Sequence, residues 1–149
     1  MRADERANLK LLGKNQEDLK VISAYLQDSI LIIKDTVFLK QNRTFVMIVN
    51  RFMWEDAEKG VFRQKKRIRS AVKFDEVIKV ESRNINQKNK NKLLECLAIK
   101  CSSTFDETYK IKIFFAGDSI ITITSEVIEV TLHDLGKPWQ VKHIPVHKI

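Results

Sequence analysis

The sequence contains one dense run of basic side chains, the segment Arg-Gln-Lys-Lys-Arg-Ile-Arg that ends at Arg69. Successive residues of a β-strand point to opposite faces, so a strand here would place every second cation on one side. Ammonium and guanidinium groups gathered on one face attract phosphates and carboxylates. The segment therefore predicts a contact surface for an anionic partner, formed by Arg63, Lys65, Lys66, Arg67 and Arg69.

A second group of cations follows in 84–92, where the sequence Asn-Ile-Asn-Gln-Lys-Asn-Lys-Asn-Lys is typical of a loop. Lys88, Lys90 and Lys92 could extend the contact surface toward an acidic protein or a nucleic acid. The window Lys59–Lys100 holds 13 basic and 4 acidic residues, so it accounts for the net charge of +8 of the whole chain. The alternative is a solvated strand face whose charge prevents aggregation, because no aromatic side chain lies within the basic run to stack on bases.

A different kind of site is indicated where the apolar strand pattern Thr44–Phe52 ends, because Asn50, Arg51 and Trp54 follow one another closely there. An aromatic ring beside an arginine can stack on a ligand while the guanidinium offers a fork of donors. These three residues are the second candidate site, a small-ligand pocket. The alternative is that Trp54 covers the end of the sheet and caps the core.

The residues that usually support catalysis or metal binding lack a matching arrangement. Cys96 and Cys101 are five residues apart, which in a regular strand points them to opposite faces. His143 and His147 have the spacing of a metal-binding helix, but Pro145 between them disfavours a helix. Phosphate-loop, dinucleotide-binding and nucleophile-elbow motifs are missing from the sequence. We therefore predict no catalytic residues, no metal and no cofactor.

One amphipathic helix is expected over Gln16–Gln27, ahead of both candidate sites. Asn15 precedes it as a favourable N-cap, whose side chain can accept a hydrogen bond from the first turn. Leu19, Ile22 and Leu26 recur at helical spacing and form one apolar face.

After the helix, the hydrophobic pattern changes to the alternation typical of β-strands, and short turns between the strands favour antiparallel pairing. Trp54–Val61 reads as a loop, Val127–Leu132 as a strand or a short helix, and Gly136 and Pro138 are expected to end regular structure. The fold class predicted is α+β, with one N-terminal amphipathic helix packed on a strongly curved, mostly antiparallel sheet or partly closed barrel of about eight strands. The longer strands predicted are Thr44–Phe52, Lys65–Phe74, Val77–Ser82, Leu93–Cys101, Tyr109–Phe115 and Ile120–Thr124.

Length and composition are those of one globular domain over 1–149, with 149 residues of which 44% are apolar and 31% charged. We expect residues 1–8 to fray and 140–149 to form an extended C-terminal tail. No apolar run reaches the ~18 residues of a membrane helix, and the charged N-terminus lacks the apolar segment of a signal peptide. Two cysteines suit a reducing compartment. These features predict a cytoplasmic protein without membrane contact.

Short blocks of residues spread over the chain resemble one known family, a small alphaproteobacterial group catalogued as domain of unknown function 2948. The resemblance extends from Leu9 to Trp139 and implies a bacterial cytosolic single-domain protein with no assigned activity. The family has no catalytic residues that could be transferred to this sequence. The blocks are Glu17-Asp18-Leu19, Ser23 to Asp28, Asn50-Arg51-Phe52, Trp54-Glu55, Phe74-Asp75, Ile128-Glu129, Leu132, Asp134 to Gly136 and Trp139.

These observations favour a non-enzymatic binding or accessory domain that contacts an acidic partner, protein or nucleic acid, through a basic strand face. Two alternatives remain open. One is an enzyme or small-ligand-binding protein with a pocket near Asn50, Arg51 and Trp54. The other is a homodimeric structural module that pairs exposed strand edges or the helix.

Overall fold

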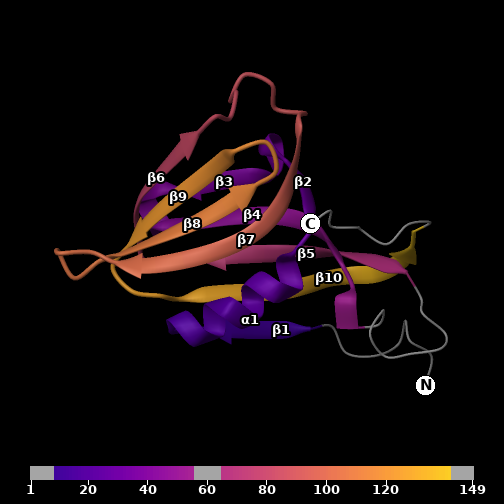
Figure 1. The fold of residues 1–149 in the computed structure, drawn as a ribbon, viewed down its shortest axis with the longest axis horizontal. Helices are drawn as coiled ribbons and strands as arrows, with labels where there is room; N and C mark the ends of the chain where they lie inside the picture. The colour runs from indigo at the N-terminus through magenta and orange to yellow at the C-terminus, as the bar shows by residue number, and fades with distance from the viewer. Residues whose placement is uncertain (1–8, 56–64, 142–149) are drawn as a thin grey trace.

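The computed structural model describes residues 9–55 and 65–141, and it shows ten strands in one sheet with an α-helix against it (Figure 1). The α+β class is therefore correct, and the number of strands is higher than the eight or so predicted. The short strands near the N-terminus form beside longer neighbours that supply their hydrogen bonds. The strands are β1 (Lys10–Gly13), β2 (Ile30–Ile32), β3 (Thr36–Leu39), β4 (Thr44–Phe52), β5 (Lys66–Phe74), β6 (Val77–Arg83), β7 (Leu93–Ser103), β8 (Tyr109–Phe115), β9 (Ser119–Ser125) and β10 (Val130–Gln140).

Helix α1 (Gln16–Leu26) forms as the sequence predicts, although strand β1 precedes it. The Asn15 side chain caps the helix, accepting a hydrogen bond of 2.8 Å from the backbone N–H of Asp18. Leu19, Ile22 and Leu26 are all buried against the sheet. The approach of α1 to β1 is close at Gly13, where an added Cβ would lie 2.9 Å from Cδ1 of Ile22.

All the strand pairs of the described residues are antiparallel, and the sheet follows the order β1-β10-β5-β4-β2-β7-β8-β9-β6. Strand β3 pairs with β4 beside this path, and the short 3-10 helix η2 (Ile33–Asp35) connects it to β2. The end strands β1 and β6 do not pair with each other, so the sheet is not closed into a barrel.

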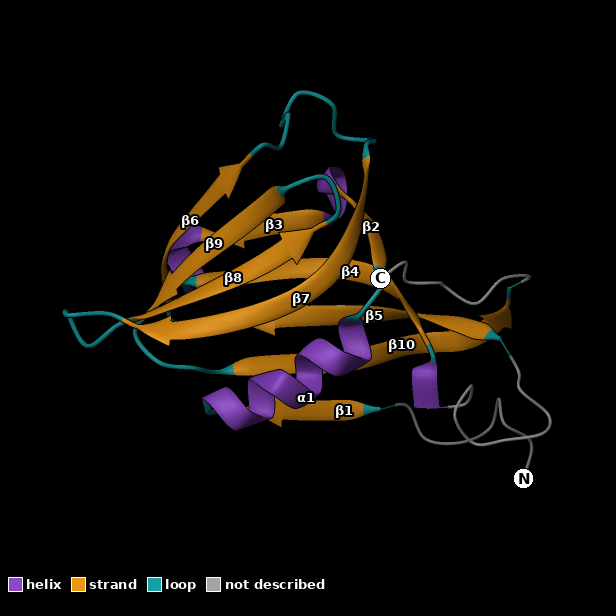
Figure 2. Ribbon diagram, viewed as in Figure 1, coloured by secondary structure: helices purple, strands orange, loops and turns teal. Residues whose placement is uncertain are grey.

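The sheet curls so that β1, β10, β5 and β4 form one wall and β7, β8, β9 and β6 form the other (Figure 2). Buried residues from both walls and from α1 make one continuous core, which includes Val72 and Phe74 of β5 and Ile113 of β8. Alternation explains this arrangement, because most inward positions of the strands are apolar while most outward ones are polar or half-exposed.

Strand β10 departs most from the prediction. It begins at Val130 rather than Val127 and runs through Gly136 and Pro138, the residues expected to end regular structure. The register of β10 against β5 shifts between Leu135 and Trp139, and Gly136 has a φ of +69° within this irregularity. A bulge can hold extra residues without ending the strand, which is why two strand-breaking residues are tolerated there.

One further prediction needs correction, and two others concern residues that lie wholly or largely outside the described part of the chain. Trp54 and Glu55, expected to begin a loop, are helical, and the rest of that segment lies outside the described residues. Residues 1–8 and 142–149, expected to fray and to form a tail, also lie outside them, whereas Gln140 belongs to β10. Within the part of the chain that is described, no helix has the length and apolar character needed to span a membrane.

Candidate functional site

The basic segment begins β5, and its cations divide between the two faces of the sheet. Lys66 points inward and is buried, with only 5% of its surface exposed. Arg69 lies on the outward face and is exposed, as is Lys73 at the next outward position but one, while Lys65 is half-buried just before the strand. Arg63 lies outside the described residues. Alternation thus separates Lys66 from the cations that could meet a partner.

Arg67 also points outward, but its guanidinium is engaged by the protein itself. Its Nη1 donates hydrogen bonds of 3.0 Å to the backbone carbonyls of Asp28 and Asn50, and the group lies over the ring of Phe52, 5.8 Å from the centroid. Burial lowers the pKa of Arg67, and the negative charges of Asp28 and Glu95 act against that shift. Arg67 therefore connects the chain after α1 to strand β4.

Strand pairing adds basic residues that are distant in sequence to the same side of the sheet. Lys10 of β1 lies opposite His133 of β10, and both are exposed. Together with Arg69 and Lys73 they form what we call the outer basic face, which spans β1, β10 and β5. No aspartate or glutamate occupies an outward position of β1, β4, β5 or β10. The nearest carboxylate in β5's own sequence is Asp75 beyond the strand, 3.5 Å from Nζ of Lys73.

Apolar side chains flank the cations of the outer basic face. Leu12 of β1 and Trp139 of β10 are exposed, while Val46 and Ile48 of β4 are half-buried beside β5. On the opposite wall, threonines of β9 accompany the cations on the outward side, together with half-buried Phe114 and Ile120. The outward lysines of that wall include Lys79, Lys100, Lys110 and Lys112.

The lysines of the Asn/Lys segment do not extend the outer basic face. Lys88, Lys90 and Lys92 lie in the loop between β6 and β7, at the top of the molecule in Figure 1. Strands β4 and β2 separate β5 from β7 in the sheet. Of the three lysines, Lys90 lines a cleft beside η2, and the other two do not.

The second candidate site contains the most deeply buried charge of the described chain. Arg51 is fully buried on the inward face of β4. Its Nε and Nη2 donate to the two carboxylate oxygens of Asp134, at 2.8 and 2.7 Å, and its Nη1 and Nη2 donate to Glu55, at 3.0 and 2.7 Å. The hydroxyl of Ser70 donates to Asp134 over 2.6 Å, and the Arg51 guanidinium lies over the ring of Tyr25. We call these five residues the Arg51 network.

The electrostatics of the Arg51 network favour a permanent positive charge on Arg51. Burial alone would lower the pKa of Arg51, but the hydrogen bonds that Arg51 donates to Asp134 and Glu55, and the negative charges of those carboxylates, outweigh it and raise the pKa. Two bidentate carboxylates occupy the donors of a guanidinium group almost completely. The geometry therefore commits Arg51 to holding β4, β10 and the segment after β4 together.

The neighbours of Arg51 in the predicted pocket point elsewhere. Asn50 faces the outer side of β4, opposite Arg69 of β5. Trp54 packs edge-to-face against Phe52, with 4.6 Å between ring centroids, and its indole N–H donates to the backbone carbonyl of Gln27 over 2.9 Å. Asn50, Arg51 and Trp54 are close in sequence, but in the structure their side chains do not converge on one pocket.

The cysteines lie in a different arrangement from the one expected. The register of β7 against β8 shifts between Cys96 and Ala98, so Cys96 and Cys101 both contact the core rather than opposite faces. Burial raises the pKa of Cys96 to about 12, with the charge of Asp28 acting in the same direction, and burial also raises the pKa of Cys101. Both thiols therefore stay protonated near neutral pH. Over 9–55 and 65–141, no group of three or more His, Cys, Asp or Glu residues is placed to hold a metal ion.

Some residues of the outer basic face and of the Arg51 network were missed by sequence reasoning. Lys73 could have been found, because it shares its alternation with Arg69. Lys10 and His133 could not, since they join the outer basic face only through the pairing of β1 with β10 and of β10 with β5. Asp134, which lies 83 residues from Arg51 in sequence, carries no local signal of its role.

Comparisons with known proteins give one match. The chain matches the family described as Protein of unknown function (DUF2948) over residues 9–147. No curated protein and no solved structure matches it. The match includes both Arg51 and Asp134, which form the central ion pair of the Arg51 network, and the strands of the outer basic face. Since the match extends over nearly the whole sequence, this chain belongs to the DUF2948 family.

Proposed function

We propose that the protein is a non-enzymatic binding module that contacts an acidic protein partner through the outer basic face. The observation that carries the proposal is the register of β1, β10 and β5, which sets Lys10, His133, Arg69 and Lys73 on one side of the sheet, where the nearby carboxylate is that of Asp75 beside Lys73. Positive charges gathered on one face attract an opposite charge. An acidic partner would supply that charge.

The apolar residues of the outer basic face favour a protein over a nucleic acid as the partner. Half-buried Val46 and Ile48 and exposed Leu12 offer contact area to an apolar side chain, whereas Trp139 alone among the described residues of this face offers a ring for base stacking. Proteins that bind single strands by stacking use aromatic side chains for successive bases. Protein interfaces combine an apolar centre with charged groups around it. An acidic segment that alternates carboxylates with aliphatic residues therefore fits this face best.

The test uses three labelled probes: a peptide of alternating glutamate and valine, the same peptide with glutamine in place of glutamate, and oligouridine RNA. Fluorescence anisotropy would measure the affinity of the full chain for each probe across a salt series. We expect the glutamate peptide to bind, and its affinity to fall as salt screens the charges. We expect the glutamine peptide to bind at least about tenfold more weakly.

A matched pair of variants locates the contact. One variant changes Lys10, Arg69 and Lys73 to serine, and the control changes Lys100, Lys110 and Lys112 to serine, so both lose three positive charges. We expect the first to weaken peptide binding about tenfold and the control less than about threefold, because charges beyond a Debye length are screened. Equal losses in both variants would mean that net charge alone attracts the peptide and would overturn the proposal. Tighter binding of RNA, lost in the first variant only, would replace the protein partner with a nucleic acid.

A further inference from the structure

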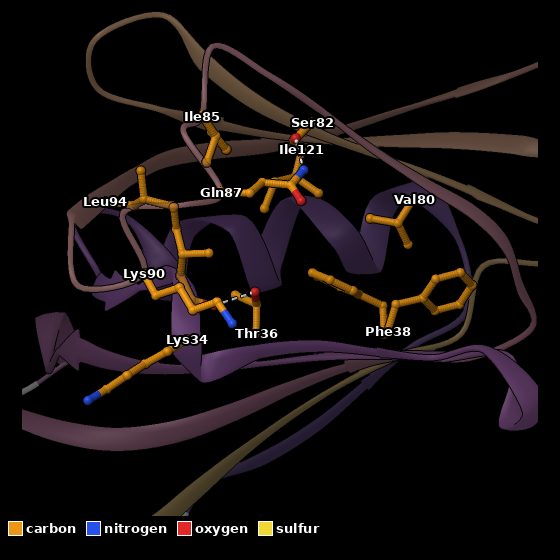
Figure 3. Close-up of a pocket in the computed structure, with 12 residues that line it drawn as sticks. Lys34, Thr36, Phe38, Val80, Ser82, Ile85, Gln87, Lys90, Leu94 and Ile121 are labelled. Atoms are coloured by element: carbon orange, nitrogen blue, oxygen red, sulfur yellow. Dashed lines mark hydrogen bonds between the residues drawn. The ribbon is translucent and has the colours of Figure 1, made fainter.

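The unclosed side of the sheet contains a cleft of about 410 Å³ between β3 and β6 (Figure 3). It lies away from both the outer basic face and the Arg51 network. Its volume falls within the ~300–1,000 Å³ typical of sites for small molecules. The lining residues come from η2, β3, β4, β6, β7, β9 and the β6–β7 loop, and those that the argument uses are Lys34, Thr36, Phe38, Val80, Gln87 and Lys90.

The inner part of the cleft is an outward extension of the hydrophobic core. Phe45 and Leu94 form part of the buried core and also line the cleft. Phe38 and Val80 pack against that core, only partly buried, and face one another across the opening (Figure 3). An apolar chain placed between Phe38 and Val80 would cover apolar surface that water now contacts. Removing that surface from water stabilises binding by about 25 cal/mol for each Å².

The charges that line the cleft are both positive, from Lys34 and Lys90, and no carboxylate is among the lining residues. The Lys90 side chain runs into the cleft toward Thr36, whereas Lys34 points away from it (Figure 3). Neither lysine forms an ion pair with a described residue. The backbone N–H of Lys34 donates to the carbonyl of Lys90 over 3.1 Å, which ties the β6–β7 loop to η2 and positions Lys90.

The neutral polar groups of the cleft already have partners. The side-chain N–H of Gln87 donates to the hydroxyl of Ser82 over 2.9 Å, and the hydroxyl of Thr36 donates to the backbone carbonyl of Ile33 over 2.7 Å. Gln87 and Thr36 therefore each have one hydrogen bond within the protein. The ammonium group of Lys90 is the charged donor directed into the cleft, which favours it for recognition of an anionic group.

From this combination we propose that the cleft binds a carboxylate with an unbranched apolar chain. The chain lies between Phe38 and Val80, and the carboxylate pairs with the Lys90 ammonium at the mouth. Because the outer basic face contributes no residue to the cleft, this site is independent of the proposed contact with an acidic protein.

The experiment titrates the full chain with decanoate, below its micelle-forming concentration, by isothermal titration calorimetry. Decanol carries the same chain without the charge, and acetate carries the same charge without the chain. We expect decanoate to bind at one site, decanol to bind about tenfold more weakly because the charge-assisted hydrogen bond is missing, and acetate not to bind measurably. Decanol binding as tightly as decanoate would overturn the role of Lys90.

Matched variants on one loop separate the local charge from the charge of the whole protein. Lys90→Met should lower decanoate affinity about tenfold, while Lys88→Met, which removes the same charge from a residue outside the cleft, should leave it unchanged within about twofold. Both residues are exposed, so the urea midpoint of each variant should match the wild type. Equal losses in both variants, or none in either, would overturn the proposal.

Nuclear magnetic resonance shift mapping with decanoate locates the site directly. We expect the largest shifts at Phe38, Val80 and the β6–β7 loop. A second cavity of about 410 Å³ lies between α1 and β7, lined by Leu19 and Cys101 among others. Shifts concentrated there would place the ligand elsewhere and contradict the proposal. Displacement of decanoate by a glutamate–valine peptide, with shifts along the unpaired edges of β3 and β6, would show that the cleft accepts a peptide strand instead.

Discussion

Arg51 and Lys90 are both cations directed toward the interior of the curled sheet, and their surroundings are opposite. Arg51 is fully buried and meets two carboxylates, Asp134 and Glu55, each at hydrogen-bond distance. Lys90 sits at the open side over an apolar cleft, and no carboxylate lines that cleft. A buried charge must be paired within the protein because water cannot solvate it. A charge at the mouth of a cleft keeps its water and remains available for a ligand, so the comparison separates a structural cation from a candidate binding one.

The largest effect on stability is expected for Arg51→Met, which we compare with the same substitution at Lys90. Arg51→Met leaves the carboxylates of Asp134 and Glu55 without their cation, and we expect a loss of about 3–5 kcal/mol in the free energy of unfolding. Lys90→Met removes no ion pair among the described residues, so its effect should stay within about 0.5 kcal/mol. Urea denaturation followed by circular dichroism measures both. A similar loss in the two variants would break the distinction between the two cations.

Replacing the central pair of the Arg51 network with apolar residues should recover part of that loss. In the double variant Arg51→Met with Asp134→Leu, no buried carboxylate remains opposite the missing cation, whereas Glu55 can turn to water because its side chain is 21% exposed. We expect the double variant to be more stable than Arg51→Met by about 1–3 kcal/mol. Urea denaturation of Arg51→Met, of Asp134→Leu and of the double variant provides the double-mutant cycle. Additive losses would mean that the two residues act independently, contrary to their contact.

A smaller effect is expected at Trp54, next to the Arg51 network. Trp54→Phe removes the donor to the carbonyl of Gln27 but keeps an aromatic ring against Phe52. We expect a loss of about 1 kcal/mol in the free energy of unfolding, typical of one hydrogen bond, and no change in decanoate affinity. Thermal denaturation and calorimetry would test the two parts. Weakened decanoate binding in this variant would place the ligand at the predicted Asn50–Trp54 pocket rather than in the cleft.

The smallest effect on decanoate affinity is expected for Lys34→Met, which we compare with Lys90→Met. Lys34 lines it but points away, so Lys34→Met should lower decanoate affinity by less than about twofold, against about tenfold for Lys90→Met. Calorimetric titration of both variants under one salt concentration provides the measurement. If Lys34→Met proved the more damaging, the carboxylate would lie at η2, and the orientation of Lys90 would not decide binding.

Local patterns were sufficient for much of the fold. The helix begins at Gln16, as its N-cap and apolar spacing predict, and β4 covers Thr44–Phe52 without a shift. Both segments contain enough residues of one periodicity to indicate their structure without help from distant parts of the chain. The bulges in β7 and β10 could not be predicted, because a bulge is a property of two paired strands. Those bulges turn Cys101 toward the core and carry β10 past Gly136.

The candidate sites, like the fold, were predictable only where a local pattern determines them. Alternation along β5 correctly separates residues such as Lys66 and Arg69, but it cannot say which face is buried. Nor could it show that Arg67 is engaged by backbone carbonyls of two other segments. The cleft has no signature in the sequence, since its lining comes from segments between Ile33 and Ile121 that no short motif joins.

What the sequence by itself determined is therefore the α+β class, the helix with its cap, most of the strand segments, and the concentration of positive charge in the middle of the chain. Only the tertiary structure decided how those charges are used. Pairing between distant strands brought Asp134 to Arg51 and added Lys10 and His133 to the outer basic face, and the fold left the ammonium group of Lys90 over an apolar cleft without an ion pair to a described residue. The physical reason is that secondary structure follows from neighbours in sequence, whereas the surroundings of a charge depend on neighbours in space.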